Sequence, residues 1–132
     1  MPESNHTTAA IIIIGAEVLS GKVNDENGPF LLRALRERGI DVKEIRTIDD
    51  DRKTIASAVR ELSQRFTYIF TTGGIGPTHD NITLESIAEA FNCPVVRNQE
   101  LADHFAQRFT DPKRRAAALR MADLPEGSTI KM

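Results

Sequence analysis

Six consecutive apolar residues, at positions 9–14 (Ala-Ala-Ile-Ile-Ile-Ile), constrain the fold of this 132-residue chain more than any other stretch. A strand with one face in water alternates apolar and polar side chains, whereas a strand covered on both faces is apolar throughout. The run ends at Gly15 and is far too short to span a membrane. We therefore expect it to be a central strand of a parallel sheet.

Strand and helix patterns alternate along the rest of the chain. Strand patterns occupy residues 40–48, 66–70, 94–97 and 128–132. Helical patterns occupy residues 28–38, 52–65, 84–91, 99–111 and 113–121. This alternation predicts an α/β fold, a three-layer doubly wound and mostly parallel sheet with helices on both faces.

Composition narrows the class of protein. Hydrophobic residues make up 40% and charged residues 27%, proportions typical of one soluble globular domain spanning residues 1–132. The net charge of −2 argues against a nucleic-acid partner. A single cysteine, Cys93, excludes an internal disulfide and fits a reducing compartment. With no signal-peptide pattern at the N-terminus, we expect a cytoplasmic protein without a membrane partner.

A glycine-rich stretch, residues 71–83 (Thr-Thr-Gly-Gly-Ile-Gly-Pro-Thr-His-Asp-Asn-Ile-Thr), lies between a strand pattern and a helical pattern. We expect a strand-to-helix crossing with Thr83 as the helix N-cap, where free backbone N–H groups attract an anion. Neither the Walker spacing nor the dinucleotide fingerprint is present. Two interpretations stay open, a cradle for a phosphate-bearing ligand and a purely structural turn.

Three loops follow the first three predicted strands, at residues 15–21, 49–51 and 73–81. The carboxyl ends of parallel strands share one edge of the sheet, so we expect Glu17, Asp50 and Asp80 to approach one another there. Their carboxylate oxygens suit Mg²⁺ held against substrate phosphates. The alternatives are local: a helix N-cap within 49–51, a loop contact for Glu17, and a helix-start contact for Asp80.

Two segments together resemble a known family. They are Gly15-x-Glu17-Val18-Leu19-Ser20-Gly21-x-Val23-x-Asp25-x-Asn27 and Thr72-Gly73-Gly74-Ile75-Gly76-Pro77-Thr78-x-Asp80. This pattern resembles the molybdopterin-binding, MoaB/Mog-like domain, in the branch found at the N-terminus of CinA (competence-damage-inducible) proteins and in eukaryotic FAD synthases. The resemblance runs from about residue 9 to the end of the chain.

The resemblance implies a homo-oligomer, dimer or trimer, and a small phosphate-bearing ligand, either molybdopterin or a nucleotide diphosphate. It also implies Mg²⁺-dependent phosphoanhydride chemistry, as in an ADP-ribose pyrophosphatase or in nucleotidyl transfer during molybdenum cofactor biosynthesis. The implied catalytic residues are Asp50 and Asp80, and the implied metal ligands are Asp80, Asp50 and Glu17. The implied ligand-binding residues are Thr72, Gly73, Gly74, Gly76, Pro77, Thr78, Asn81, Glu17 and Ser20.

Two departures from the family pattern bear on function. Asp80-Asn81 stands where two consecutive aspartates are common, and an amide keeps a carbonyl oxygen but loses the negative charge that binds Mg²⁺. This favours an alternative function, a non-catalytic ligand-binding or assembly module. A nucleotide-binding enzyme of another class is a third alternative. The printed sequence stops at Met132, before the Pro-Gly-rich stretch usual in the family, which implies a domain lacking its usual C-terminal segment.

Overall fold

The structure is a computed structural model that describes residues 6–75 and 82–131. It consists of two compact units, Met1–Gly73 and Gly74–Met132. The expected single domain over residues 1–132 stays a prediction.

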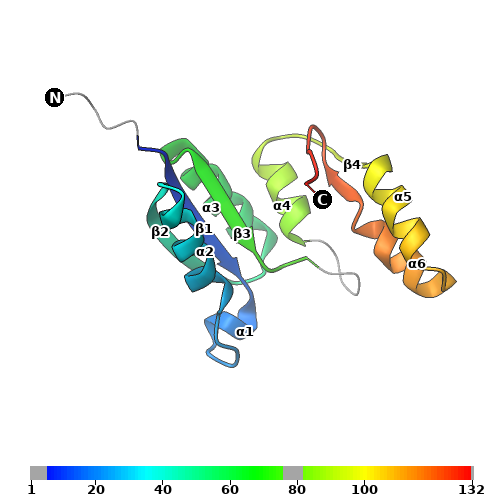
Figure 1. Cartoon of the computed structure of the whole chain (residues 1–132), viewed down its shortest axis with the longest axis horizontal. Coiled ribbons are helices and arrows are strands. Elements are labelled where there is room, and N and C mark those ends of the chain that lie inside the picture. The colour runs from blue at the N-terminus through cyan, green and yellow to red at the C-terminus, as the bar shows by residue number, and fades with distance from the viewer. Residues whose placement is uncertain (1–5, 76–81, 132) are drawn as a thin grey trace. The chain divides into compact units, whose positions relative to one another are not determined.

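The first unit contains a parallel three-stranded sheet in the order β2-β1-β3 (Figure 1). Along the chain its elements are β1 (Thr8–Ile14), α1 (Ala16–Leu19), α2 (Asn27–Glu37), β2 (Asp41–Ile48), α3 (Arg52–Arg65) and β3 (Tyr68–Thr72). Every residue from Ala9 to Ile14 is at most 5% exposed. The prediction of a central strand covered on both faces is confirmed.

Helices cover opposite faces of this sheet. On one face Ile11 and Ile13 pack with Leu35 of α2. On the other face Arg46 lies beside Ile12 in register, and its guanidinium donates to Glu61 of α3 at 3.0 Å. The chain moves from β1 to β2 and then crosses back to β3, and right-handed crossovers in opposite directions place their helices on opposite faces. The doubly wound α/β prediction is therefore confirmed.

The α3 helix forms where its pattern predicts, over Arg52–Arg65. Asp51 is its N-cap, because its carboxylate accepts from Thr54 N at 3.0 Å and from Thr54 Oγ1 at 2.7 Å. Ile55 and Leu62 are fully buried on its inner face. One residue of the 49–51 acidic run is thus a cap, as the local alternative expected.

The third strand lies two residues later than predicted. The 66–70 pattern suggested a buried strand, but β3 spans Tyr68–Thr72 at the edge of the sheet, and Tyr68 is 51% exposed. Pairing with β1 explains the shift, because Ile12 and Ile13 offer partners to Thr71 and Thr72. Thr72 therefore belongs to the end of a strand and not to a loop.

The second unit contains helices and a two-stranded antiparallel ribbon of β4 and β5. Its elements are α4 (Ile82–Ala90), β4 (Val95–Arg97), α5 (Gln99–Arg108), α6 (Pro112–Arg120) and β5 (Asp123–Pro125). Asn98 caps α5 by accepting from Leu101 N at 3.0 Å. Arg97 Nε donates to Asp123 Oδ1 at 2.6 Å across the ribbon.

Two predictions in the second unit are wrong. Thr83 is not an N-cap but lies fully buried inside α4, and its backbone N–H donates to the Gly74 carbonyl at 3.2 Å. No strand forms over residues 128–131. The final strand is Asp123–Pro125, since Leu124 is buried there opposite Val96 and Gly127, with φ +88°, turns the chain away.

Gly73 sits where the ends of β3 and β1 meet. Its φ of +93° is in the left-handed region, and a Cβ at this position would overlap the backbone carbonyl oxygen of Ile14. The neighbour is rigid strand backbone, so it cannot move aside as a flexible side chain would. At Gly73 the fold itself requires glycine, which gives the structural-turn interpretation a concrete basis.

Replacing Gly73 with alanine is expected to destabilise the first unit strongly. The left-handed conformation alone costs about 1–2 kcal/mol, and the overlap with Ile14 adds a comparable amount. Gly21→Ala is the matched control, because Gly21 has φ +83° and nothing within 4 Å of an added Cβ. Urea unfolding of both variants measures the difference; equal losses of stability would contradict this account of Gly73.

Candidate functional site

A hollow of about 290 Å³ opens at the carboxyl end of β1. Its lining comes from the end of β1, from α1, from the segment leading into α2 and from the end of β3. The lining residues are Ile13, Ile14, Glu17, Val18, Val23, Asn24, Asp25, Glu26, Asn27, Thr72 and Gly73. This is the sheet edge at which open α/β folds bind ligands, and we call it the edge hollow.

The loop after β1 is held by its own backbone and side chains. Gly15 N donates to the Ile48 carbonyl at 3.0 Å, which ties the ends of β1 and β2 together. The Glu17 carboxylate lies over Gly15, where an added Cβ would stand 2.7 Å from Oε1. Ser20 Oγ donates to the Glu17 carbonyl at 3.3 Å and does not line the edge hollow. A ligand role for Ser20 stays a prediction.

Asp25 caps the start of α2. Its two carboxylate oxygens accept from Asn27 N at 3.1 Å and from Gly28 N at 2.9 Å. A Cβ on Gly28 would overlap this carboxylate, so the glycine permits the cap. These two backbone donors are already bound to a side-chain anion, and the N-terminus of α2 therefore has less to offer a ligand phosphate.

A side-chain hydrogen bond links the two family segments. Asn27 Nδ2 donates to Thr72 Oγ1 at 2.9 Å, which joins the start of α2 to the end of β3. The sequence patterns did not predict this contact. The sequence offered one clue to the contact: Asn27 is the last residue of the first family segment, and Thr72 is the first residue of the second.

Asp50 has a perturbed environment although it is exposed. Its pKa is raised by the hydrogen bond with the Asp49 side chain, then by burial, and then by the negative charges of Asp49 and Glu17. The loop after β2 is therefore close enough to the loop after β1 for their carboxylates to repel. A divalent cation relieves such repulsion, and hard carboxylate oxygens are the donors that Mg²⁺ prefers.

Negative charge dominates the edge hollow. Among the residues that the structure describes, its lining includes Glu17, Asp25 and Glu26 but no lysine or arginine. Within residues 6–75 and 82–131, no three acidic, histidine or cysteine side chains are grouped closely enough to hold a metal ion. Five predicted site residues lie outside the described residues: Gly76, Pro77, Thr78, Asp80 and Asn81. Their roles, and those of Glu17, Asp50, Thr72, Gly73 and Gly74 toward a ligand or metal, stay predictions.

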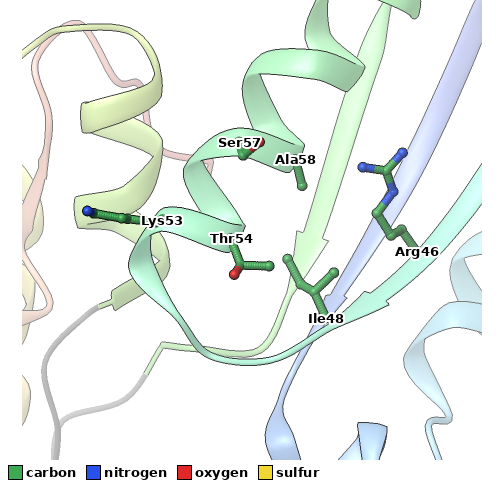
Figure 2. Close-up of a pocket in the computed structure, with 6 residues that line it drawn as sticks. All are labelled: Arg46, Ile48, Lys53, Thr54, Ser57 and Ala58. Atoms are coloured by element: carbon green, nitrogen blue, oxygen red, sulfur yellow. The ribbon is translucent and has the colours of Figure 1, made fainter.

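A second hollow, of about 470 Å³, lies between β2 and α3. Figure 2 shows Arg46 and Lys53 on opposite sides of it with their cationic groups pointing apart. Arg46 is paired with Glu44 and Glu61, and Thr54 Oγ1 donates to Asp51. The side chains do not converge on one point, so this hollow lacks the arrangement of an anion site.

The fold and the edge hollow define an α/β protein with its candidate site at the carboxyl edge of a parallel sheet. A family model described as a probable molybdopterin-binding domain matches residues 10–130. The chain belongs to this family, as the two sequence segments predicted.

Curated relatives agree with this assignment. A CinA-like protein of Citrifermentans bemidjiense is 40% identical over 124 residues, covering 92% of this chain and 30% of the relative. A probable FAD synthase of Caenorhabditis briggsae is 34% identical over 117 residues, covering 86% of this chain and 22% of the relative. The chain thus spans less than a third of the length of either protein.

A solved structure has the same fold. The crystal structure of the protein CinA, of unknown function, from Thermoplasma acidophilum matches with a TM-score of 0.81 at 26% identity. The match covers 93% of this chain and 73% of that protein. Over the described ranges, none of the helices is long and apolar enough to cross a membrane.

Asp50→Asn is expected to raise the melting temperature at pH 7 and low salt by about 1–2 °C, the size typical of exposed like charges. Because the folded-state pKa of Asp50 is raised, its contribution to stability is present below the ordinary carboxyl pKa and is lost as the pH rises through the folded-state value. The increase in melting temperature of the variant should therefore become smaller as the pH falls towards 4. Thermal melts from pH 3.5 to 7 measure it.

Asp51 supplies a control of opposite sign. Hydrogen bonds from Thr54 lower the pKa of Asp51, so its stabilising effect is present above the ordinary carboxyl pKa and is lost as the pH falls. Asp51→Ala should lower the melting temperature at pH 7 and matter less in acid. A lower melting temperature for Asp50→Asn at pH 7 would contradict a destabilising effect of the charged Asp50 side chain.

Proposed function

We propose that this chain binds a pterin phosphate or a nucleotide diphosphate at the edge hollow, together with the glycine-rich stretch that continues from Gly73. The observation that carries the proposal is the Asn27–Thr72 hydrogen bond, which joins the two family segments beside one hollow. Membership in a family of molybdopterin-binding domains supports a pterin phosphate. Similarity to CinA-like proteins and FAD synthases supports a nucleotide as the alternative ligand.

The charge of the edge hollow bears on how a phosphate enters it. Glu17, Asp25 and Glu26 repel a diphosphate, and no cationic side chain among the described lining residues offsets them. The proposal therefore includes Mg²⁺, with Glu17, Asp50 and Asp80 as the residues that would hold it. When bound, Mg²⁺ supplies positive charge to the phosphate oxygens and to charge that develops on them.

The reaction that this arrangement suits is cleavage or formation of a phosphoanhydride bond, as in a nucleotide pyrophosphatase or a nucleotidyl transferase. Within the described residues, the chain's own part is positional. The Glu17 loop is fixed over Gly15, and Thr72 is fixed by Asn27. Groups that are fixed before the ligand arrives lose little entropy when it binds.

Binding of ADP-ribose is expected to require Mg²⁺. Three like charges at the hollow, at about 0.5–1 kcal/mol each, cost about 2 kcal/mol, which is about thirtyfold in affinity. Titration calorimetry with ADP-ribose, ATP and a pterin phosphate, in Mg²⁺ and in EDTA, measures this. Release of AMP from ADP-ribose would report turnover, and absence of binding for all three ligands would overturn the proposal.

The Glu17→Gln variant tests the need for Mg²⁺ at one residue of the edge hollow. It should reduce the difference in ADP-ribose affinity between Mg²⁺ and EDTA, because one repelling carboxylate and one metal ligand are removed together. Glu37→Gln, at the exposed C-terminal end of α2, is the matched control and should leave the difference unchanged. Equal effects of the two variants would show that net charge matters and position does not.

A second candidate function is a ligand-binding or assembly module without catalysis. Asn81 favours it, because the amide lacks the charge of the second aspartate common in the family. Asn81→Asp is expected to raise Mg²⁺ affinity by about tenfold, the effect of one added charged ligand worth about 1.4 kcal/mol. Mg²⁺ titration of both proteins measures it, and unchanged affinity would remove Asn81 as a reason for inactivity.

A further inference from the structure

The Thr72 side chain lies on the face of the sheet that α2 covers. Thr72 is paired in register with Ile13, and Ile13 packs with Leu35 of α2. Residues directly opposite one another on paired strands direct their side chains to the same face of the sheet. The register therefore brings the Thr72 hydroxyl to the start of α2, where Thr72 lines the edge hollow.

Asn27 is held in place by the cap of α2. Its backbone N–H donates to Asp25 Oδ1 at 3.1 Å, and Gly28 N donates to Oδ2 of the same carboxylate at 2.9 Å. These bonds fix the first turn of the helix, from which Asn27 Nδ2 reaches Thr72 Oγ1 at 2.9 Å. The amide and the hydroxyl are thus each positioned by a separate element of the fold.

The direction of the Asn27–Thr72 hydrogen bond determines what the hydroxyl offers a ligand. A threonine hydroxyl has one proton and two lone pairs. Because Asn27 donates, one lone pair is occupied and the hydroxyl proton points elsewhere. Within residues 6–75 and 82–131, no protein group accepts that proton. It is therefore available to an acceptor that enters the edge hollow.

Side-chain donors are few in the described part of the edge hollow. Three of the lining side chains are carboxylates, which accept hydrogen bonds and do not donate them. The donors are the Thr72 hydroxyl and the amides of Asn24 and Asn27. An ionised phosphate oxygen only accepts, and its hydrogen bonds are stronger than those between neutral groups. The free hydroxyl proton matches such an oxygen.

We propose that Asn27 is a positioning residue that makes the Thr72 hydroxyl a hydrogen-bond donor to a phosphate oxygen of the ligand. This inference rests on the proposed function, which places a phosphate-bearing ligand at the edge hollow. The first family segment supplies the amide that sets the direction of the bond, and the second supplies the hydroxyl that meets the ligand. Asn27 acts through Thr72 and not by its own contact with the phosphate.

Asn27→Asp reverses this hydrogen bond and keeps the shape of the side chain. A carboxylate only accepts, so the Thr72 hydroxyl would donate to it and present only lone pairs to the ligand. The link between α2 and β3 would persist, because a hydrogen bond to a carboxylate is stronger than one to a neutral group. The variant therefore separates control of the proton's direction from a purely structural link.

A double-mutant cycle measures the effect on binding. The probe is whichever of ADP-ribose, ATP and a pterin phosphate binds most tightly in Mg²⁺ by titration calorimetry. In the otherwise unchanged chain, Thr72→Val should lower the affinity about tenfold, and Thr72→Ser, which keeps the hydroxyl, should change it less than about twofold. In the Asn27→Asp background, Thr72→Val should cause no further loss.

Asn24→Asp is the matched control for charge. It makes the same substitution in the lining of the same hollow, and the structure shows no hydrogen bond from the described Asn24 to Thr72. In this background Thr72→Val should still lower the affinity about tenfold. If Thr72→Val costs as much with Asn27→Asp as without it, added charge or a loosened link explains the data and the proposal is overturned.

The side-chain amide of Asn27 gives a readout that needs no ligand. Its NMR signal should move in Thr72→Val and stay in place in Thr72→Ser, and an unmoved signal in Thr72→Val would contradict the contact itself. A chain that binds none of the three ligands overturns the proposed function as well. A chain that binds normally after Thr72→Val overturns only the roles of Asn27 and Thr72. Urea unfolding establishes that each variant is folded.

Discussion

Burial of β1 on both faces is the constraint on which the first unit depends. Residues Ala9 to Ile14 are almost completely removed from water, and truncating one buried isoleucine to alanine typically costs about 2–5 kcal/mol. Covering both faces of one strand requires helices on both sides, which α2 and α3 provide. With β2 and β3 on its two edges, β1 brings three strand ends to one sheet edge, where the loops with Glu17, Asp50 and Gly73 begin.

Close packing at these strand ends also shapes the candidate site. Gly73 passes so close to the Ile14 carbonyl that a side chain does not fit, and Gly28 leaves room for the Asp25 cap. Gly73, which the family motif associates with a ligand, thus also has a packing role, and Gly28 has a packing role at the start of α2. Glycine in a binding segment lets either a ligand or a neighbouring backbone approach closely. At Gly73 the structure shows a close backbone neighbour, the carbonyl of Ile14.

Features encoded by neighbouring residues were predictable from the sequence. The apolar run of β1 and the bounds of α3 each depend on a local pattern. Features that depend on distant pairing were not. The strand β3 shifted because Ile12 and Ile13 supply its partners, and the last strand lies at Asp123–Pro125 because β4 pairs with it there. The Asn27–Thr72 bond joins residues 45 positions apart, a contact that no local spacing reveals.

The central claim is that the two family segments form one ligand site at the carboxyl edge of the sheet. Backbone amide chemical-shift mapping tests it most directly, during titration with ADP-ribose, ATP or a pterin phosphate in Mg²⁺. The account predicts that the largest changes fall together in residues 15–28 and 72–75. Changes confined to the hollow between β2 and α3, around Arg46 and Lys53, would contradict it.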